Sequence, residues 1–218
     1  MTFTVHSIPG SPFGRAVLAA LEEKRAPYRF AAVVPPAHRG PEHLARHPFG
    51  RVPAIEHDGF ALYETSAILR YIDRVFPTPP LTPADPRAAA RMDQVMSISD
   101  WYLFQGVGNV IGFERVVKPR LIGQPADEAA CAAAMPAARI VLGALETLLG
   151  AKAFLAGETL SLADLVVYPQ MDFMAETPEW TALRESAPSL VAWLARMAER
   201  PSSQATTWEK VAGLAQAA

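Results

Sequence analysis

The apolar and polar residues in the first third of the chain alternate in ways that predict both strands and helices. Short runs rich in β-branched and aromatic residues indicate strands, and longer runs of helix-forming residues indicate helices. The expected strands are Thr2–Ser7, Tyr28–Val34, Val52–Glu56 and Ala61–Tyr63, and the expected helices are Ala16–Lys24, Pro41–Arg46 and Thr65–Val75. Asp58-Gly59 is a strong hairpin signal. The order β-α-β-α-β-β-α therefore predicts a parallel strand pair followed by an antiparallel hairpin.

The remainder of the chain has helical periodicity and no strand signal of comparable strength. The expected helices are Arg87–Val117, Asp127–Leu149, Leu162–Ala175 and Pro188–Glu199. Five prolines lie between Phe76 and Pro86, and such a stretch is neither helix interior nor central strand. We therefore expect an α/β domain over residues 1–76, a stiff proline-rich linker over 77–86 and an all-α domain over 87–218.

Composition and charge narrow the class of protein. Half of the 218 residues are hydrophobic and 19% are charged, which is typical of a globular chain. The formal net charge of −2 gives no electrostatic reason to expect nucleic acid or an anionic membrane as partner. Cys131 is the single cysteine, so an intramolecular disulfide is excluded and a reducing compartment fits. No secretory signal is recognised, and the apolar stretches are too short or too interrupted to cross a bilayer. We expect a soluble cytoplasmic protein.

One helix start is specified by several residues at once. Ser161 is spaced to cap the helix that begins at Leu162, and Asp164 is spaced to reach back to it. We interpret the two residues as a capping box, that is, as a folding device and not a catalytic pair.

Four segments taken together resemble the glutathione transferases, most closely the serine-type plant (phi/theta-like) and bacterial members. They are Ser11–Val17, His38-Arg39 with His47–Ala54, Leu62–Ile68, and Ser161–Asp164. They occur in the family's order and spacing, and the resemblance covers nearly the whole chain. The family usually has Asn, Ser and Gln or Lys where this chain has His47, Thr65 and Arg51.

The resemblance implies a fold, an activity and partners. The fold is a thioredoxin-like α/β N-terminal domain followed by an all-α C-terminal domain. The activity is transfer of glutathione, a co-substrate, to a small hydrophobic electrophile, as in detoxification. The resemblance also implies a homodimer. We expect no metal site, and structural or surface roles for the histidines other than His38, although His43 and His47 are four residues apart.

The resemblance places Ser11 as the catalytic residue, donating a hydrogen bond to the sulfur without itself attacking. Glutathione must present a thiolate, and a thiol with a pKa near ~8.5 is ionised by only a few per cent at pH 7. Ionising most of it requires about 2.7 kcal/mol. A hydroxyl donor supplies ~1.5–3 kcal/mol and a helix N-terminus ~0.3–1 kcal/mol. Ser11 is also placed as an ordinary N-cap before Pro12, and the two interpretations are compatible.

The resemblance also implies which residues bind the rest of glutathione. A cis Val52–Pro53 bond would present the Val52 backbone to the cysteinyl part, although Pro53 also fits the first position of a strand. Glu64 and Thr65 would meet the γ-glutamyl end, the alternative being a helix start capped by Thr65.

The glycyl carboxylate and the electrophile have their own candidates. His38, Arg39 and Arg51 would surround the glycyl carboxylate, the alternative being solvated surface charges. Phe13 and a group of residues after the linker would form the electrophile pocket, although aromatic residues at helical spacing are usually core. That group is Trp101, Tyr102, Phe104 and Gln105.

Two rival functions remain open on the sequence alone. The first is another glutathione-dependent reaction at the same site, such as peroxide reduction or isomerisation. The second is a non-catalytic ligand-binding protein of the same fold, because fold alone does not determine function.

Overall fold

The computed structural model describes residues 2–217. By its internal contacts the chain forms two compact units, and each is described by itself. The first unit combines residues 2–81 with the C-terminal residues 199–217, and the second consists of residues 82–198. The last helices of the chain are thus grouped by contact with the N-terminal residues. The division expected from the sequence, at residues 76 and 87, stays a prediction about folding units.

A four-stranded sheet forms the centre of the first unit. Its strands are β1 (Phe3–Ser7), β2 (Tyr28–Ala32), β3 (Ala54–His57) and β4 (Phe60–Tyr63), in the order β2-β1-β3-β4. β1 pairs with β2 in parallel and with β3 in antiparallel orientation, and β3 pairs with β4 in antiparallel orientation. Asp58 and Gly59 both have positive φ, 50° and 81°, as a tight two-residue hairpin requires. The predicted parallel pair and hairpin are confirmed.

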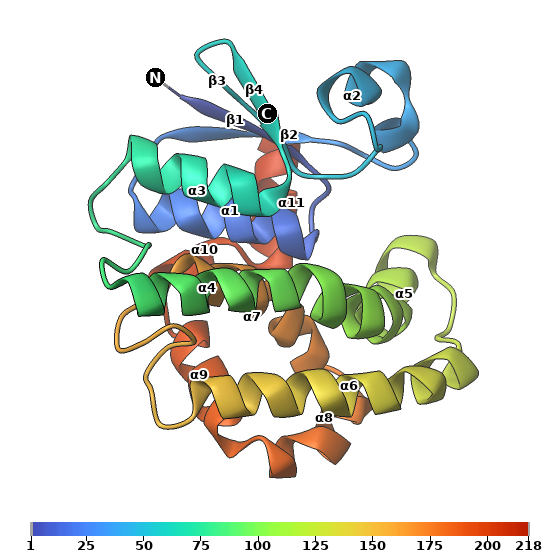
Figure 1. Ribbon diagram of the computed structural model, residues 1–218. Coiled ribbons are helices and arrows are strands. Elements are labelled where there is room, and N and C mark those ends of the chain that lie inside the picture. Colours follow the sequence, from blue (N-terminus) through green and yellow to red (C-terminus); the bar gives the residue numbers. More distant parts are fainter. Residues whose placement is uncertain (1, 218) are drawn as a thin grey trace. The chain divides into compact units, whose positions relative to one another are not determined.

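Helices α1 (Pro12–Glu23) and α3 (Thr65–Val75) lie side by side on the sheet (Figure 1). Each presents an apolar stripe to the strands. The fully buried members of that core include Val17, Leu21, Ile68 and Ile72 from the helices and Phe3 and Val5 from β1. Burying one such side chain contributes about 1.5–3 kcal/mol. The 3-10 turn η1 (Ala37–Arg39) and α2 (Pro41–Arg46) lie apart from the α1–α3 pair.

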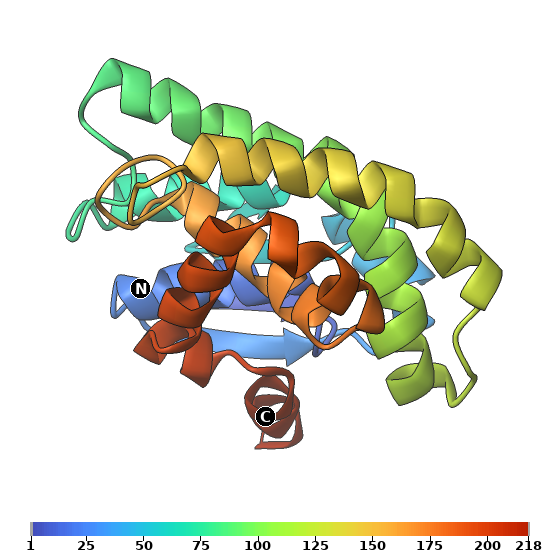
Figure 2. The same cartoon turned by 90° about the horizontal axis from the view of Figure 1, so that it is seen from below.

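The C-terminal residues add two helices to the first unit. α10 (Pro201–Ala205) packs against α1, and α11 (Trp208–Ala217) packs against β2. Figure 2 shows α11 beside the C label, next to the blue strand of the sheet. Neither helix was expected from the sequence, because elements of five and ten residues are too short for apolar periodicity to be read with certainty.

The second unit is all helical. Its elements are α4 (Pro86–Ile98), the π-helical stretch η2 (Ser99–Val117), α5 (Lys118–Ile122), α6 (Glu128–Leu149), α7 (Leu162–Ala175), α8 (Pro178–Leu183), η3 (Arg184–Ser186) and α9 (Pro188–Ala198). α6 runs back along η2 (Figures 1 and 2). The four long predicted helices are confirmed within about one residue at most ends, the first of them as α4 plus η2. The short helices α5 and α8 were not expected.

Helix α7 is central to the second unit, and nearly all of its residues are buried. Its start is the predicted capping box, which is confirmed: the Asp164 carboxylate accepts hydrogen bonds from the Ser161 backbone N–H at 2.9 Å and from its hydroxyl at 2.7 Å. The same carboxylate accepts from the Leu155 N–H at 2.8 Å and from Trp193 Nε1 at 2.9 Å. The capping residue therefore also ties two other segments to α7.

Helix α6 corrects one expectation. By length and composition alone it is apolar enough to cross a membrane, so the statement that every apolar stretch is too short or interrupted is wrong for this helix. Its buried residues Ala134, Ala138, Leu142 and Leu145 recur every three or four positions, whereas Ile140 is exposed. This is the pattern of a helix that packs along one side, here against η2 and α9.

Candidate active site

Ser11 is the N-cap residue of α1, as the sequence predicts. Its backbone is extended, Pro12 occupies the first helical position, and its Oγ accepts a hydrogen bond from the Gly14 N–H at 3.2 Å. Because this bond uses a lone pair of the oxygen, the hydroxyl proton is still available for an acceptor. The positive end of the α1 dipole lies at the same place. The site can therefore stabilise an anion with one hydroxyl and one helix end.

The backbone around Ser11 is closely packed. A Cβ atom at Gly14 would overlap the hydroxyl of Ser7, and a Cβ atom at Gly10 would overlap the Trp208 side chain. Gly10 also has a φ of +84°, a backbone conformation that residues other than glycine rarely adopt. The turn before α1 is thus fixed by contacts on two sides.

Glu64 stands at the start of α3 in an unusual conformation. Its φ of 72° is positive, and such a backbone costs about 1–3 kcal/mol in a residue other than glycine and recurs at ligand sites as well as in turns. Glu64 is the N-cap, but its exposed side chain makes no capping hydrogen bond. Thr65 is the first helical residue and is 8% exposed. The alternative of Thr65 as the cap is therefore wrong.

The segment before β3 contains the expected cis Val52–Pro53 bond. Val52 is half-buried and precedes the first residue of the strand, Ala54. The carbonyl oxygen of Arg51 lies 2.7 Å from His43 Nε2, so the buried His43 of α2 contacts the backbone at the start of this segment. His43 was not among the predicted site residues. The sequence feature that could have indicated it is its position four residues before His47.

The basic residues predicted for the glycyl carboxylate are brought together. The carbonyl oxygen of His38 would be 3.3 Å and the Cγ of Arg39 3.8 Å from a Cβ at Gly50, so η1 lies against the loop that carries Arg51. Burial lowers the pKa of His38, and the charges of Arg39, His43 and Arg51 lower it further. His38 is half-buried, whereas Arg39 and Arg51 are exposed. The result is a basic region at one end of the site.

His47 connects this basic region with Glu64. The side chain is buried, and its ring centroid is 4.7 Å from that of Tyr63. Burial lowers the pKa of His47, the Glu64 carboxylate acts in the opposite direction, and His43 and Arg51 add to the lowering. His47, one of the three departures from the family pattern, therefore has both predicted ends of the glutathione site as electrostatic neighbours.

The residues predicted for the electrophile lie in both units. Phe13 is half-buried in the first unit, and Trp101 and Tyr102 in η2 are 72% and 63% exposed. The alternative that these two aromatic residues belong to the core is wrong, because Leu103 and Val107 occupy the core positions of this stretch. Among the described residues no group of three His, Cys, Asp or Glu side chains is arranged to hold a metal ion.

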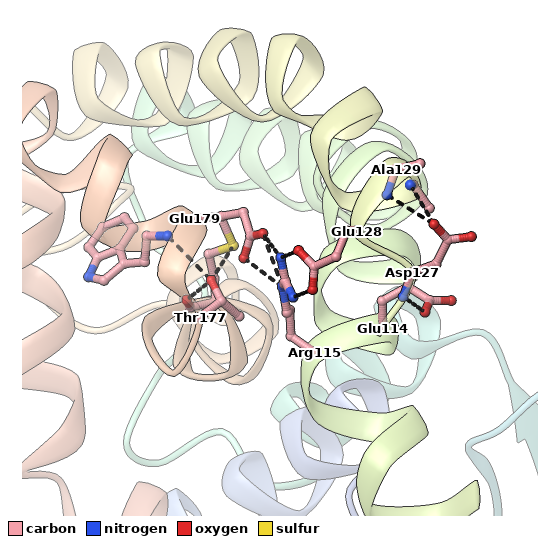
Figure 3. Close-up of polar contacts among 10 residues, drawn as sticks. Glu114, Arg115, Asp127, Glu128, Ala129, Thr177 and Glu179 are labelled. Carbon is pink, nitrogen blue, oxygen red and sulfur yellow. Dashed lines mark hydrogen bonds and ion pairs between the residues drawn. The ribbon is translucent and has the colours of Figure 1, made fainter. Parts of the chain in front are cut away.

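A second polar cluster, in the helical unit, was not foreseen. Figure 3 shows the Arg115 guanidinium between two carboxylates, donating to Glu179 at 2.6 Å and to Glu128 at 2.7 Å. It borders an open cavity of about 400 Å³ lined by Ala132, Met135, Pro178 and Ala182. Both carboxylates are engaged by the guanidinium, so neither is a free base or nucleophile. We interpret the cluster as a connection between η2, α6 and α8.

Comparison with known proteins places the chain in a family. Residues 5–80 match the family model of the glutathione S-transferase N-terminal domain, and residues 110–201 match that of the C-terminal domain. Probable glutathione S-transferase GSTF1 of Oryza sativa subsp. japonica is 32% identical over 191 residues, which cover 85% of this chain and 86% of the relative. A glutathione S-transferase of Hyoscyamus muticus is 31% identical over 206 residues, 93% of this chain and 96% of the relative.

Solved structures agree with these relatives. Glutathione transferase F7 from Populus trichocarpa has a TM-score of 0.83 at 27% identity, covering 98% of this chain and 99% of that one. Glutathione S-transferase-I bound with lactoylglutathione has a TM-score of 0.82 at 29% identity, covering 97% and 99%. The thioredoxin-like sheet and the all-α unit are those of the predicted fold. With both family models matched in order along it, the chain belongs to the glutathione S-transferase family.

Proposed function

We propose that this glutathione transferase joins the sulfur of glutathione to a small hydrophobic electrophile, with Ser11 stabilising the thiolate. The observation that carries the proposal is the geometry of Ser11, which accepts from Gly14 and keeps its own proton to donate at the start of α1. The thiol proton passes to solvent before the reaction. In a substitution the sulfur–carbon bond then forms as the bond to the leaving group breaks.

The energies are of the right size for this role. Shifting a thiol pKa from ~8.5 to below neutrality requires roughly 2.7 kcal/mol. One hydroxyl donor contributes about 1.5–3 kcal/mol, and the N-terminus of α1 about 0.3–1 kcal/mol. Holding the two reactants together lowers the barrier further, since proximity alone supplies several kcal/mol.

The remaining predicted residues bind the peptide part of glutathione. Glu64 receives the ammonium of the γ-glutamyl group, and the N-terminal amides of α3 with Thr65 receive its carboxylate. The backbone of Val52, held ahead of β3 next to Pro53, pairs with the cysteinyl part. The exposed carboxylate of Glu64, which makes no capping hydrogen bond, supports this placement, and its positive φ is a form of backbone strain that recurs at ligand sites.

The opposite end of the tripeptide carries the glycyl carboxylate. His38, Arg39 and Arg51 supply the donors for it, and their adjacency around Gly50 supports the assignment. Phe13 in the first unit contacts the electrophile, and the role of Tyr102 in the second unit stays the expectation drawn from the resemblance. The protein works as a cytoplasmic homodimer in detoxification, with no metal.

Titration of bound glutathione by ultraviolet absorbance tests the assignment. We expect the thiolate band of the wild-type complex to persist well below pH 8, and Ser11→Ala to move its midpoint back toward ~8.5. The same variant should lower kcat/KM about 30-fold, the equivalent of roughly 2 kcal/mol of lost hydrogen bonding. Ser97→Ala, which alters an exposed hydroxyl bonded only to the Asp93 carbonyl among the contacts seen, is the matched control.

Other outcomes would overturn parts of the proposal. Unchanged turnover in Ser11→Ala with glutathione still bound would exclude Ser11 as the activating residue. Turnover of an organic hydroperoxide with none of a model electrophile would favour the peroxidase. Failure of the wild-type protein to bind glutathione at all would leave only the fold.

A further inference from the structure

The C-terminal residues of the chain reach the turn that carries Ser11. A Cβ atom at Gly10 would overlap the six-membered ring of Trp208, so this ring lies directly against the glycine that precedes Ser11. Gly10 is buried and has a φ of +84°. Trp208 is the first residue of α11, a helix that packs against β2 and whose Val211 is buried. The contact joins residues nearly 200 positions apart within the same compact unit.

Two further contacts fasten the same segment along α1. Near the start of α1, Arg15 is almost completely buried and its Nε donates to the Thr206 carbonyl oxygen at 2.8 Å. At the end of α1, the Glu23 carboxylate accepts two hydrogen bonds from Arg200, both at 2.8 Å, and one from the Ser202 hydroxyl. Residues 200–208 therefore follow α1 from its last turn to the turn before its first residue.

We infer that residues 200–208 position Ser11 for its role in thiolate stabilisation, with Trp208 as the positioning residue that fixes the Gly10–Ser11 turn. The inference rests on the proposed function of Ser11. Trp208 does not touch the sulfur in this scheme. It acts through Gly10, and the segment as a whole acts through the alignment of α1.

The physical reason is the conformational freedom of Gly10. A glycine reaches positive and negative φ with similar ease, so its backbone alone does not hold a single conformation. The Trp208 ring occupies the space into which the peptide would otherwise move. A hydrogen bond to a developing or resident anion weakens steeply with distance and angle, and a displacement of ~1 Å can cost up to 100-fold in rate. Removing the ring should therefore weaken the bond from Ser11 without removing any group that touches glutathione.

The experiment compares Trp208→Ala, Trp208→Phe and the control Leu214→Ala, which alters a more exposed residue of the same helix. We expect the thiol pKa of bound glutathione to rise by about 0.5–1 unit in Trp208→Ala and kcat to fall roughly tenfold. The KM for glutathione should change by no more than about twofold, because the peptide-binding residues are untouched. Trp208→Phe keeps a six-membered ring and should restore most of both values. Leu214→Ala should match the wild type.

Folding is checked by circular dichroism and by urea unfolding, with all titrations done far below the unfolding midpoint. If Trp208→Ala does not fold, Trp208→Phe and Trp208→Leu carry the comparison, the second having no ring to rest on Gly10. A wild-type thiol pKa in every folded variant would overturn the inference, and so would a loss confined to stability.

The two proposals fail in different ways. If the wild-type protein shows no lowered thiol pKa in bound glutathione, the role of Ser11 is wrong and the role of Trp208 falls with it. If the wild type shows the lowered pKa and Ser11→Ala abolishes it while Trp208→Ala does not, only the positioning role is wrong.

Discussion

Two buried polar regions of this protein are built differently. Around Asp164 in the helical unit, one carboxylate accepts four hydrogen bonds, from Leu155, Trp193 and both donors of Ser161. Around the start of α1 and α2 in the first unit, buried polar atoms are left without a hydrogen-bond partner. In the described part of the chain these include Ser7 Oγ, His38 Nδ1, His43 Nδ1 and His47 Nδ1.

The difference indicates which region is organised for folding and which for binding. A buried polar atom without a partner costs about 1–3 kcal/mol, so it is retained where a ligand, a water molecule or a catalytic role accounts for it. The Asp164 carboxylate has no such cost, although Gln170 Oε1 further along the same helix is also buried without a partner. Substitutions there should lower stability and leave thiolate chemistry alone, whereas substitutions at Ser11 or Trp208 should change thiolate chemistry.

The largest effect on stability should come from Asp164→Ala. It leaves four buried donors without an acceptor, and we expect the free energy of unfolding to fall by about 4 kcal/mol in urea titration. Glu158→Ala, an exposed carboxylate near the same helix start, should have little effect. A loss below about 1 kcal/mol would mean that the network is far weaker than its geometry indicates.

A smaller effect is expected at the Arg115 cluster, which is also paired but lies nearer the surface. Arg115→Met leaves the mostly buried Glu179 carboxylate uncompensated and should cost about 2 kcal/mol in the same assay. Arg120→Met is the matched control, because its partner Glu176 is far more exposed. An equal loss in both variants would contradict the importance of burial. The thiol pKa of bound glutathione should be unchanged in both.

The smallest effect is expected in the pH dependence of stability, through His47 in the first unit. The pKa of His47 is lowered below its usual 6.5, chiefly by burial, so the unfolded chain binds this proton more readily than the folded one. Stability from this residue is therefore complete above pH 6.5 and is lost as the pH falls through the lower folded-state value. His47→Asn should flatten the decline in unfolding midpoint below pH 6.5.

The charges around His47 sharpen this last test. The Glu64 carboxylate opposes the lowering, whereas His43 and Arg51 add to it. Glu64→Gln should therefore steepen the fall in unfolding midpoint below pH 6.5. If Glu64→Gln and His47→Asn gave the same pH profile of the midpoint, His47 would not titrate in this range. Thr147→Asn, at an exposed position of α6 in the other unit, controls for the introduction of an amide.

Local signals in the sequence determined much of the fold. Asp58-Gly59 specified the hairpin, because a two-residue turn with positive φ has few alternatives. The bounds of α3 and α7 and the capping box of Ser161 and Asp164 also depend on neighbouring residues, and the structure has them as expected. Ser11 as the N-cap of α1 belongs to the same class, since Pro12 follows it directly. Its part in catalysis stays a prediction.

Tertiary structure decided what neighbouring residues do not encode. The ring of Trp208 against Gly10, the Arg15 bond to Thr206 and the approach of Arg115 to Glu179 each join residues more than 60 positions apart. No apolar period or turn signal announces such pairs, because they arise only when separate helices pack and exclude water from between them. The sequence alone therefore identified the helix start that carries Ser11, whereas the segment that holds it in place became visible only in the folded chain.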